Sequence, residues 1–358
     1  MESFILATLC DWVSRNWALV AISATVLILV GVTCYFLAYY VRIILNIFCD
    51  THPPLSRKVM DFDEIEGETI RFRSWDGTSL QGTLLGSQQE PYKGTILFSH
   101  EFHADGASCA RYAKPLLDAG YQIFTFDYRA HGESSGKDYS PLQWPSDKEV
   151  GDLLGACAYM RSRLSDEGKD PSVGVFGISR GAGVALLAAS SDSDIKAIVC
   201  DGAFDTQSTL ISLMKRWGQL FAKIGILYKE HPEPYWRFLY RLLIHFAQRR
   251  LKRRFPSVAK ALREMQPRPV YFIHGKRDSY IRVDQTESLH EMAPSPKYLW
   301  IVPKAKHNQA VATQPERYAL RTVAFFDKHL AGLDIAPTDI SPEDDPNTSA
   351  CEVAHGTA

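Results

Sequence analysis

The sequence SVGVFGISRGAGVALLAAS occupies residues 172–190 and changes character at Ser179. The residues before the serine are mostly β-branched or aromatic, which predicts a buried strand over Ser172–Phe176. The residues after it are small and apolar, which predicts a helix over Gly181–Ser190. Glycines lie two residues away on both sides, so the stretch fits the pattern G-x-S-x-G. A plain Gly-Ser turn has the same string, but the expected strand and helix around it favour a nucleophilic serine at the sheet edge.

Short apolar strands alternate with helical stretches on both sides of this turn. After Pro91 the strands are apolar on both faces, which is typical of a parallel sheet covered by helices. Before it, two strands flank Trp75-Asp76-Gly77, which predicts a hairpin. We therefore expect an α/β fold with a mostly parallel sheet, whose ligand site lies at the carboxyl ends of the strands. The expected strands are Thr69–Arg73, Ser79–Leu85, Gly94–Ser99, Tyr121–Phe126, Ser172–Phe176, Ala197–Cys200, Val270–Ile273 and Tyr298–Val302. The expected helices are Ala107–Asp118, Asp147–Leu164, Gly181–Ser190 and Pro315–Leu330.

A nucleophilic serine needs a base, and the base needs an acid that orients it. Asp278 and His307 each follow the end of an expected strand, in the chain order Ser179, Asp278, His307. Taken singly, either could be an ordinary surface residue, because Asp284 and His290 lie in the same region. Their shared position at one edge of the sheet favours a catalytic triad.

These motifs resemble the α/β-hydrolase family from about Ile65 to Leu330. The matching stretches are the loop Ser99-His100-Glu101-Phe102, the stretch Asp127–Ser134 (DYRAHGES), the turn at Ser179, and the two loops that carry Asp278 and His307. The resemblance is closest to the serine-hydrolase branch with esterases, monoacylglycerol-lipase-like enzymes and acyl thioesterases. It implies hydrolysis of esters or thioesters with an apolar acyl part, and no cofactor.

The resemblance also implies a role for each site residue. Ser179 is the expected nucleophile, His307 the general base and then acid, and Asp278 the residue that orients it. The backbone amides of Phe102 and Arg180 are the expected oxyanion hole.

The expected oxyanion loop departs from the family pattern at Glu101, where the family usually has glycine. A carboxylate here, beside His100, is similar to the dienelactone-hydrolase arrangement, so small-substrate lactone chemistry is an alternative. The string His100-Glu101-Phe102-His103 lacks the H-E-x-x-H spacing of zinc sites, and we expect no metal. Other polar residues near the site, Asp127, His131, Asp201 and Asp205, are expected to support loops through hydrogen bonds.

The N-terminal region contains 26 uncharged residues from Asn16 to Val41. An apolar helix over residues 17–41 is long enough to cross a bilayer, and it has aromatic residues at both ends. A cleaved signal peptide is the alternative, but its apolar region would be shorter and its start more basic. More cations follow the span than precede it, which predicts a single-pass protein with its catalytic domain in the cytoplasm.

The predicted organisation is a membrane anchor over residues 1–50, a hydrolase domain over 51–332 and an acidic tail over 333–358. The net charge of −1 and the 46% hydrophobic content exclude a disordered or multi-span chain and do not indicate nucleic-acid binding. The seven cysteines lack paired spacing, so no disulfide framework is expected.

Residues 205–267 interrupt the strand pattern and form an expected lid. An amphipathic helix is predicted there, with Trp236, Leu239, Leu243 and Phe246 on its apolar face and Arg237, Arg241, His245, Gln248 and Lys252 on its polar face. A cationic cluster follows at Arg249–Arg254. The insertion is expected to pack on the hydrolase core or to contact anionic lipid headgroups, and nucleic-acid binding is disfavoured because stacking aromatics do not interleave with the cations. A non-catalytic scaffold that binds a partner through the basic insertion and the acidic tail is an alternative function. The oligomeric state is left open.

Overall fold

The computed structural model describes residues 12–50, 66–86, 91–136, 138–221, 231–336 and 340 of the 358-residue chain. The chain divides into two compact units. The smaller unit combines Met1–Thr51 with His231–Leu251, and the larger combines His52–Glu230 with Lys252–Ala358. Part of the expected lid and nearly all of the expected acidic tail lie outside the described residues.

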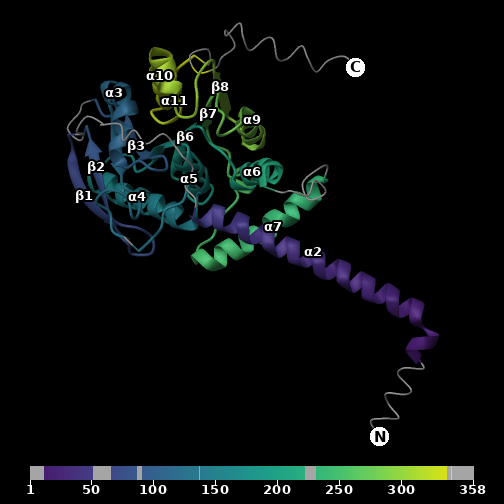
Figure 1. Ribbon diagram of the computed structural model, residues 1–358. Helices are drawn as coiled ribbons and strands as arrows, with labels where there is room; N and C mark the ends of the chain where they lie inside the picture. The colour runs from purple at the N-terminus through teal and green to yellow at the C-terminus, as the bar shows by residue number, and fades with distance from the viewer. Residues whose placement is uncertain are drawn as a thin grey trace, which may run out of the picture. The chain divides into compact units, whose positions relative to one another are not determined.

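The larger unit is built on an eight-stranded sheet with the order β1-β2-β4-β3-β5-β6-β7-β8 (Figure 1). Pairing is antiparallel between β1 and β2 and between β2 and β4, and parallel at every other strand pair. The strands are β1 (Glu68–Arg73), β2 (Ser79–Leu85), β3 (Gly94–Ser99), β4 (Tyr121–Phe126), β5 (Val173–Ile178), β6 (Ile195–Asp201), β7 (Val270–Gly275) and β8 (Lys297–Val302). The expected mostly parallel sheet is confirmed.

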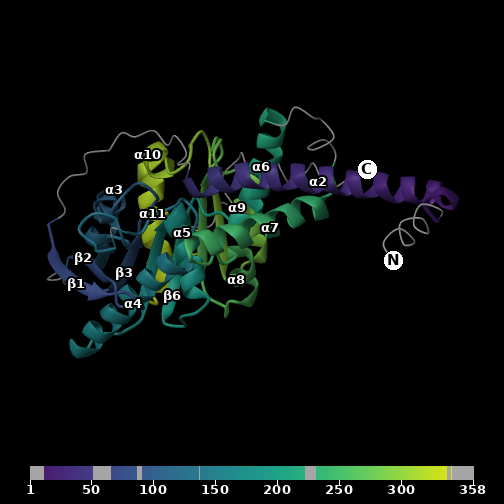
Figure 2. The same cartoon turned by 60° about the horizontal axis from the view of Figure 1, so that its bottom comes forward.

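Helices cover both faces of this sheet and enclose two apolar cores. One core contains residues of α4 (Asp147–Asp166), α5 (Arg180–Ala189), α8 (Val258–Glu264) and α9 (Val283–Met292). The other contains residues of α3 (Ala110–Asp118), α10 (Ala310–Thr313) and α11 (Pro315–His329). Figure 1 shows α3 and α11 on one side of the strands and α4 and α5 on the other, and Figure 2 shows the same elements turned by 60°. All residues of β3, β4, β5 and β7 are buried, as their two-sided apolar pattern predicts.

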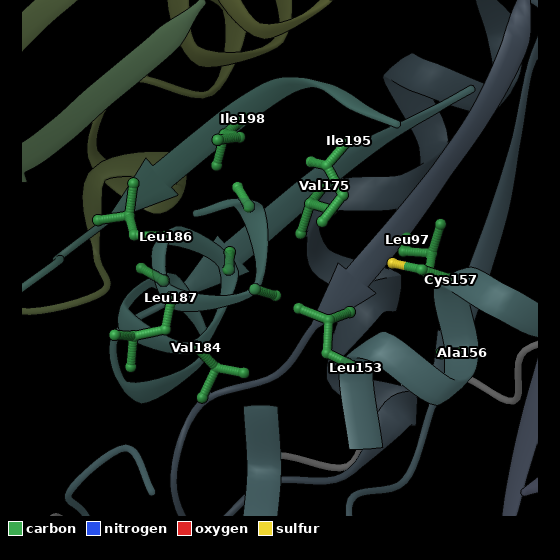
Figure 3. Packing of buried hydrophobic residues seen from close by; sticks show 14 of the residues in the cluster. Leu97, Leu153, Ala156, Cys157, Val175, Val184, Leu186, Leu187, Ile195 and Ile198 are labelled. Carbon is green, nitrogen blue, oxygen red and sulfur yellow. The ribbon is translucent and has the colours of Figure 1, made fainter. Parts of the chain in front are cut away.

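Helix α5 is buried along its whole length, because its small residues let it approach the sheet closely. Figure 3 shows Val184, Leu186 and Leu187 of α5 beside Val175 and Ile198 of the neighbouring strands. This packing holds the turn before α5 at the carboxyl edge of the sheet.

The expected helix Ala107–Asp118 is divided into a short 3-10 helix, η1 (Gly106–Cys109), and α3. The sequence patterns did not predict α6 (Thr206–Phe221), α8, α9 or α10. Three of these four helices have at most ten residues, and such short elements show little periodicity of their own.

The smaller unit contains α2 (Trp17–Asp50) and α7 (Glu233–Leu251). α2 has 34 residues and is long and apolar enough to cross a membrane, although a signal sequence near the N-terminus passes the same test. Its buried residues, Val41, Phe48 and Cys49, lie at its C-terminal end, where it packs against α7.

The structure confirms an amphipathic α7 but corrects two details of the insertion. Phe246, expected on the packed face, is 44% exposed. The expected cationic cluster is also not a single exposed surface. Arg253 is buried over the ring of Tyr139 and donates a hydrogen bond to the Ser140 carbonyl, because the guanidinium plane stacks on aromatic faces.

Candidate active site

Ser179 lies in the turn between β5 and α5, with φ 52° and ψ −113°. This left-handed backbone conformation is rare for a residue with a side chain, and its strain is offset by the packed elements on both sides. The Ser179 amide donates to the Asp201 carbonyl at 2.7 Å. A Cβ on Gly181 would lie 2.0 Å from the Ser99 carbonyl oxygen, so only glycine fits there.

The three residues expected to form a triad are linked by hydrogen bonds. Ser179 Oγ lies 2.8 Å from His307 Nε2, and His307 Nδ1 lies 2.6 Å from Asp278 Oδ2. Since the carboxylate only accepts, Nδ1 carries the proton and Nε2 accepts from the serine hydroxyl. Burial alone would raise the pKa of Asp278, but the hydrogen bond and charge of His307 outweigh it and hold that pKa below its usual value. The geometry is that of a serine activated by a base.

The two expected oxyanion residues come from different parts of the chain. Arg180 is the first residue of α5, and its backbone amide donates no hydrogen bond to the described residues. Phe102 is buried in the loop after β3. The Arg180 guanidinium carbon lies 5.3 Å from the centre of the Phe102 ring, so the two segments are in direct contact.

Comparisons with known proteins agree with this fold. Residues 94–237 match the family described as alpha/beta hydrolase fold. The uncharacterized protein YqkD of Bacillus subtilis is 28% identical over 272 residues, which cover 74% of this chain and 81% of that protein. The uncharacterized protein YfhR of Escherichia coli is 25% identical over 258 residues, which cover 71% and 78% of the two chains. The esterase Pf2001 of Pyrococcus furiosus has a TM-score of 0.55 and 22% identity, over 74% of this chain and 93% of that one.

This chain has the α/β-hydrolase fold. The family match begins at the first residue of β3 and includes the turn at Ser179, and the structural likeness to Pf2001 covers 74% of this chain. The resemblance stated from the sequence motifs is therefore confirmed for the fold.

The loop after β3 is held by His100. Its Nδ1 donates to the Glu101 carbonyl at 2.8 Å, and its Nε2 accepts from the Tyr128 amide at 3.3 Å. Burial keeps its pKa well below the usual value, so His100 is neutral. Both ring nitrogens form hydrogen bonds with backbone atoms, and His100 therefore stabilises the conformation of the loop.

Glu101 follows in the same loop, and its Oε2 accepts a 3.2 Å hydrogen bond from Ser108. Burial is the main cause of its raised pKa. The positive φ of the loop falls on His103, at 64°, and not on Glu101. Glu101 thus takes the place of the family's glycine without left-handed backbone strain.

Asp127 and His131 have the structural roles that the sequence predicted. Asp127 accepts from the amides of Gly106 and Glu133 at 2.8 and 2.9 Å, joining two loops of the α/β-hydrolase unit. His131 Nδ1 donates to the Arg129 carbonyl, and its Nε2 accepts from an Arg180 nitrogen at 3.3 Å. Burial lowers the pKa of His131 to about 4, so the ring is neutral at pH 7.

Two further acids lie near the site of this hydrolase fold. Asp205 supports its loops, since it accepts hydrogen bonds from the Gln207 and Ala259 amides and from the Ser257 hydroxyl. Asp201 is fully buried and accepts a 2.9 Å hydrogen bond from Tyr318. Burial raises the pKa of Asp201 to about 7.

His274 is a site residue that the sequence patterns missed. It is fully buried at the end of β7, and its Nε2 lies 3.0 Å from the Ile281 carbonyl and 3.3 Å from Asp278 Oδ2. Its Nδ1 lies 2.8 Å from Thr286 Oγ1. His274 therefore touches Asp278 in addition to His307. The spacing His274-Gly275-Lys276-Arg277-Asp278 was visible in the sequence, but His274 follows the predicted strand Val270–Ile273 and no pattern there pointed to contact with Asp278.

Among the described residues, no group of three or more His, Cys, Asp or Glu side chains is arranged to hold a metal ion.

Proposed function

We propose that this protein is a membrane-anchored serine hydrolase that cleaves carboxylic esters or thioesters with an apolar acyl part. One observation carries the proposal: Ser179, His307 and Asp278 form a continuous hydrogen-bonded chain at the turn between a buried strand and a helix. Such a chain activates a serine hydroxyl that is otherwise a weak nucleophile.

In the proposed reaction, Ser179 Oγ attacks the acyl carbon while its proton passes to His307 Nε2. Asp278 remains ionised and stabilises the resulting imidazolium. The amides of Phe102 and Arg180 bind the oxyanion of the tetrahedral intermediate. The intermediate collapses when His307 gives the proton to the departing alcohol or thiol, leaving an acyl-enzyme. Water, activated by His307, attacks this acyl-enzyme and releases the acid and the free serine.

A fluorophosphonate probe, which labels activated serines, tests the nucleophile. We expect labelling of the wild-type chain and of Ser190→Ala, a control at the other end of α5, and none of Ser179→Ala. Equal labelling of wild type and Ser179→Ala would refute the assignment. The rate of ester hydrolysis, measured on the same samples, should also be lost in Ser179→Ala and retained in Ser190→Ala.

The anchoring part of the proposal rests on α2, whose most apolar stretch has no buried residues. An uncleaved span explains this exposed surface, because about 20 apolar residues cross a bilayer core. Arginines at Leu27 and Val30 would each cost about 3 kcal/mol at the bilayer centre. We expect Leu27→Arg/Val30→Arg to be extracted from membranes by alkaline carbonate, whereas wild type and Leu27→Ala/Val30→Ala remain. A cytoplasmic location of residues 52–358 predicts their protection from protease added to intact cells.

The dienelactone-hydrolase-like alternative is favoured by Glu101, whose partly buried carboxyl lies in the loop of the proposed oxyanion hole. A series of p-nitrophenyl esters distinguishes the two functions. Rising kcat/KM with acyl length supports the apolar-acyl hydrolase. A strict preference for the shortest acyl group supports the small-substrate alternative.

A further inference from the structure

α7 presents two chemically different faces. Its buried residues are Trp236, Leu239, Tyr240, Leu243 and Ala247, which recur at helical spacing along one side. α7 packs against α2, and Figure 1 shows the two helices crossing near the C-terminal end of α2. α7 is therefore attached to the helix that contains the candidate span.

The other side of α7 carries cations and aromatic rings together. Arg237, Arg241 and His245 are exposed and follow one another at intervals of four residues, which places them in one row. Phe238 and Phe246, one position further along the chain, form a second row and are 53% and 44% exposed. A helix that combines these two rows on one surface suits the boundary between headgroups and acyl chains.

The charges on this surface have no protein partner in the described part of the chain. The guanidinium groups of Arg237, Arg241 and Arg249 form no ion pair with any described carboxylate. Arg250 differs, because it pairs with Asp50 at 2.8 Å. We call Arg237, Arg241, Arg249, Phe238 and Phe246 the α7 outer face.

The contacts between α2 and α7 bear on the position of the α7 outer face along the bilayer normal. Burial of α2 begins at Val41, where the expected span ends, and Arg250 of α7 donates to Asn46 at 2.9 Å. The ten residues from Val41 to Asp50 rise about 15 Å along the helix. The headgroup region on one side of a bilayer is roughly 5–8 Å thick, so this stretch of α2 passes through it. Arg250, at the C-terminal end of α7, is consequently held at the height of the lipid headgroups.

We propose that α7 is an interfacial helix whose outer face binds the anionic headgroups of the membrane crossed by α2. The arginines pair with the headgroup anions, and Phe238 and Phe246 enter the acyl boundary. The proposal rests on the anchoring part of the proposed function and adds a lipid-composition preference to it. Each arginine near an anionic surface favours the bound state by about fivefold.

The test uses the full chain in nanodiscs of phosphatidylcholine alone or with 30% phosphatidylserine. Hydrogen–deuterium exchange followed by mass spectrometry reports on the α7 amides. We expect exchange to be at least fivefold slower with phosphatidylserine in 0.1 M salt. In 0.5 M salt the difference should shrink, because screening shortens the electrostatic range. This salt arm needs no substitution and is independent of variant folding.

The variant Arg237→Glu/Arg241→Glu/Arg249→Glu should lose the lipid dependence. The matched control Lys196→Glu/Lys260→Glu/Arg263→Glu changes the charge equally at exposed positions of the other unit, and it should keep the dependence. The proposal would be overturned if the amides of wild-type α7 exchanged equally fast in the two lipid compositions. It would also be overturned if both triple variants lost the lipid dependence to the same extent.

The same samples separate this inference from the hydrolase proposal. Failure of the chain to elute with nanodiscs would refute the span and the interfacial helix together. Loss of fluorophosphonate labelling with a lipid-sensitive α7 would refute the hydrolase alone. Labelling with a lipid-insensitive α7 would refute only the interfacial helix.

Discussion

The guanidinium group of Arg180 stacks on the ring of Phe102, with 5.3 Å between the guanidinium carbon and the ring centre. Arg180 is the first residue of α5, which follows β5, and Phe102 lies in the loop after β3; both are expected oxyanion residues. Arg180 is fully buried, and its Nη1 donates to the Leu142 carbonyl at 3.1 Å. The guanidinium is thus fixed, and through the Phe102 ring it positions the opposite side of the proposed oxyanion hole.

Arg180→Lys keeps the charge but removes the planar group that stacks. We expect kcat to fall about 10- to 100-fold with little change in KM, because loss of a whole oxyanion donor costs about 10²- to 10³-fold. Phe102→Leu keeps the backbone amide and removes the ring, so it should have a similar effect. The double variant should be no worse than either single one, since both remove the same contact. Additive losses in p-nitrophenyl ester kinetics would show that the two side chains act separately.

Gly181→Ala should abolish activity and lower the free energy of unfolding by more than about 3 kcal/mol, because the new Cβ would overlap the Ser99 carbonyl oxygen. Gly77→Ala is the matched control: Gly77 has a φ of 86° but nothing within 4 Å of a new Cβ. It should cost only about 1 kcal/mol. Urea denaturation of both variants measures the difference. Similar losses would mean that steric overlap at the turn is relieved by movement of β3.

His274→Leu removes a group that lies 3.3 Å from Asp278 Oδ2 and favours its ionised form. We expect a several-fold loss of kcat and a shift of the acid limb of kcat/KM to higher pH, because the pKa of Asp278 rises. His274→Gln retains an N–H donor and should restore most of the wild-type profile. A pH profile that falls in height without moving would indicate only a packing role for His274.

Asp201 makes stability depend on pH in an unusual direction. Its pKa is raised by burial from 3.8 to about 7, so between these values the folded chain holds a proton that the unfolded chain has released. The contribution of Asp201 to the free energy of unfolding therefore falls as pH rises from about 4 to 7, by up to about 4 kcal/mol. In urea denaturation at a series of pH values from 4.5 to 8, Asp201→Asn should not show this decrease in the free energy of unfolding.

Tyr318→Phe should increase the pH dependence that Asp201→Asn removes. The Tyr318 hydroxyl donates to Asp201 and favours the ionised carboxylate, so its removal should raise the pKa of Asp201 further and steepen the loss. If wild type and Asp201→Asn show parallel pH dependence, the Asp201 carboxyl ionises normally in the folded chain.

Several elements were predictable because their residues carry the pattern locally. The bounds of β2, β3 and β4 agree with the predicted strands, because β3 and β4 are short apolar runs and β2 follows the turn at Trp75-Asp76-Gly77. The turn at Ser179 was predictable for the same reason. Short helices such as α9, and the division of Ala107–Asp118 into η1 and α3, depend on tertiary packing that no local pattern contains.

Some residues of the candidate site were likewise predictable from the sequence, and others were found only in the tertiary structure. Chain order and the ends of strands were enough to select Ser179, Asp278 and His307, because parallel strands bring their carboxyl ends to one edge. Only the folded chain placed His274 against Asp278, stacked Arg180 on Phe102 and buried Arg253, because these contacts join residues distant in sequence or depend on side-chain direction. The apolar run at the N-terminus was evident from hydropathy alone. Its partnership with α7, nearly two hundred residues away, depended on the tertiary structure, because the buried faces of both helices form only when the helices meet.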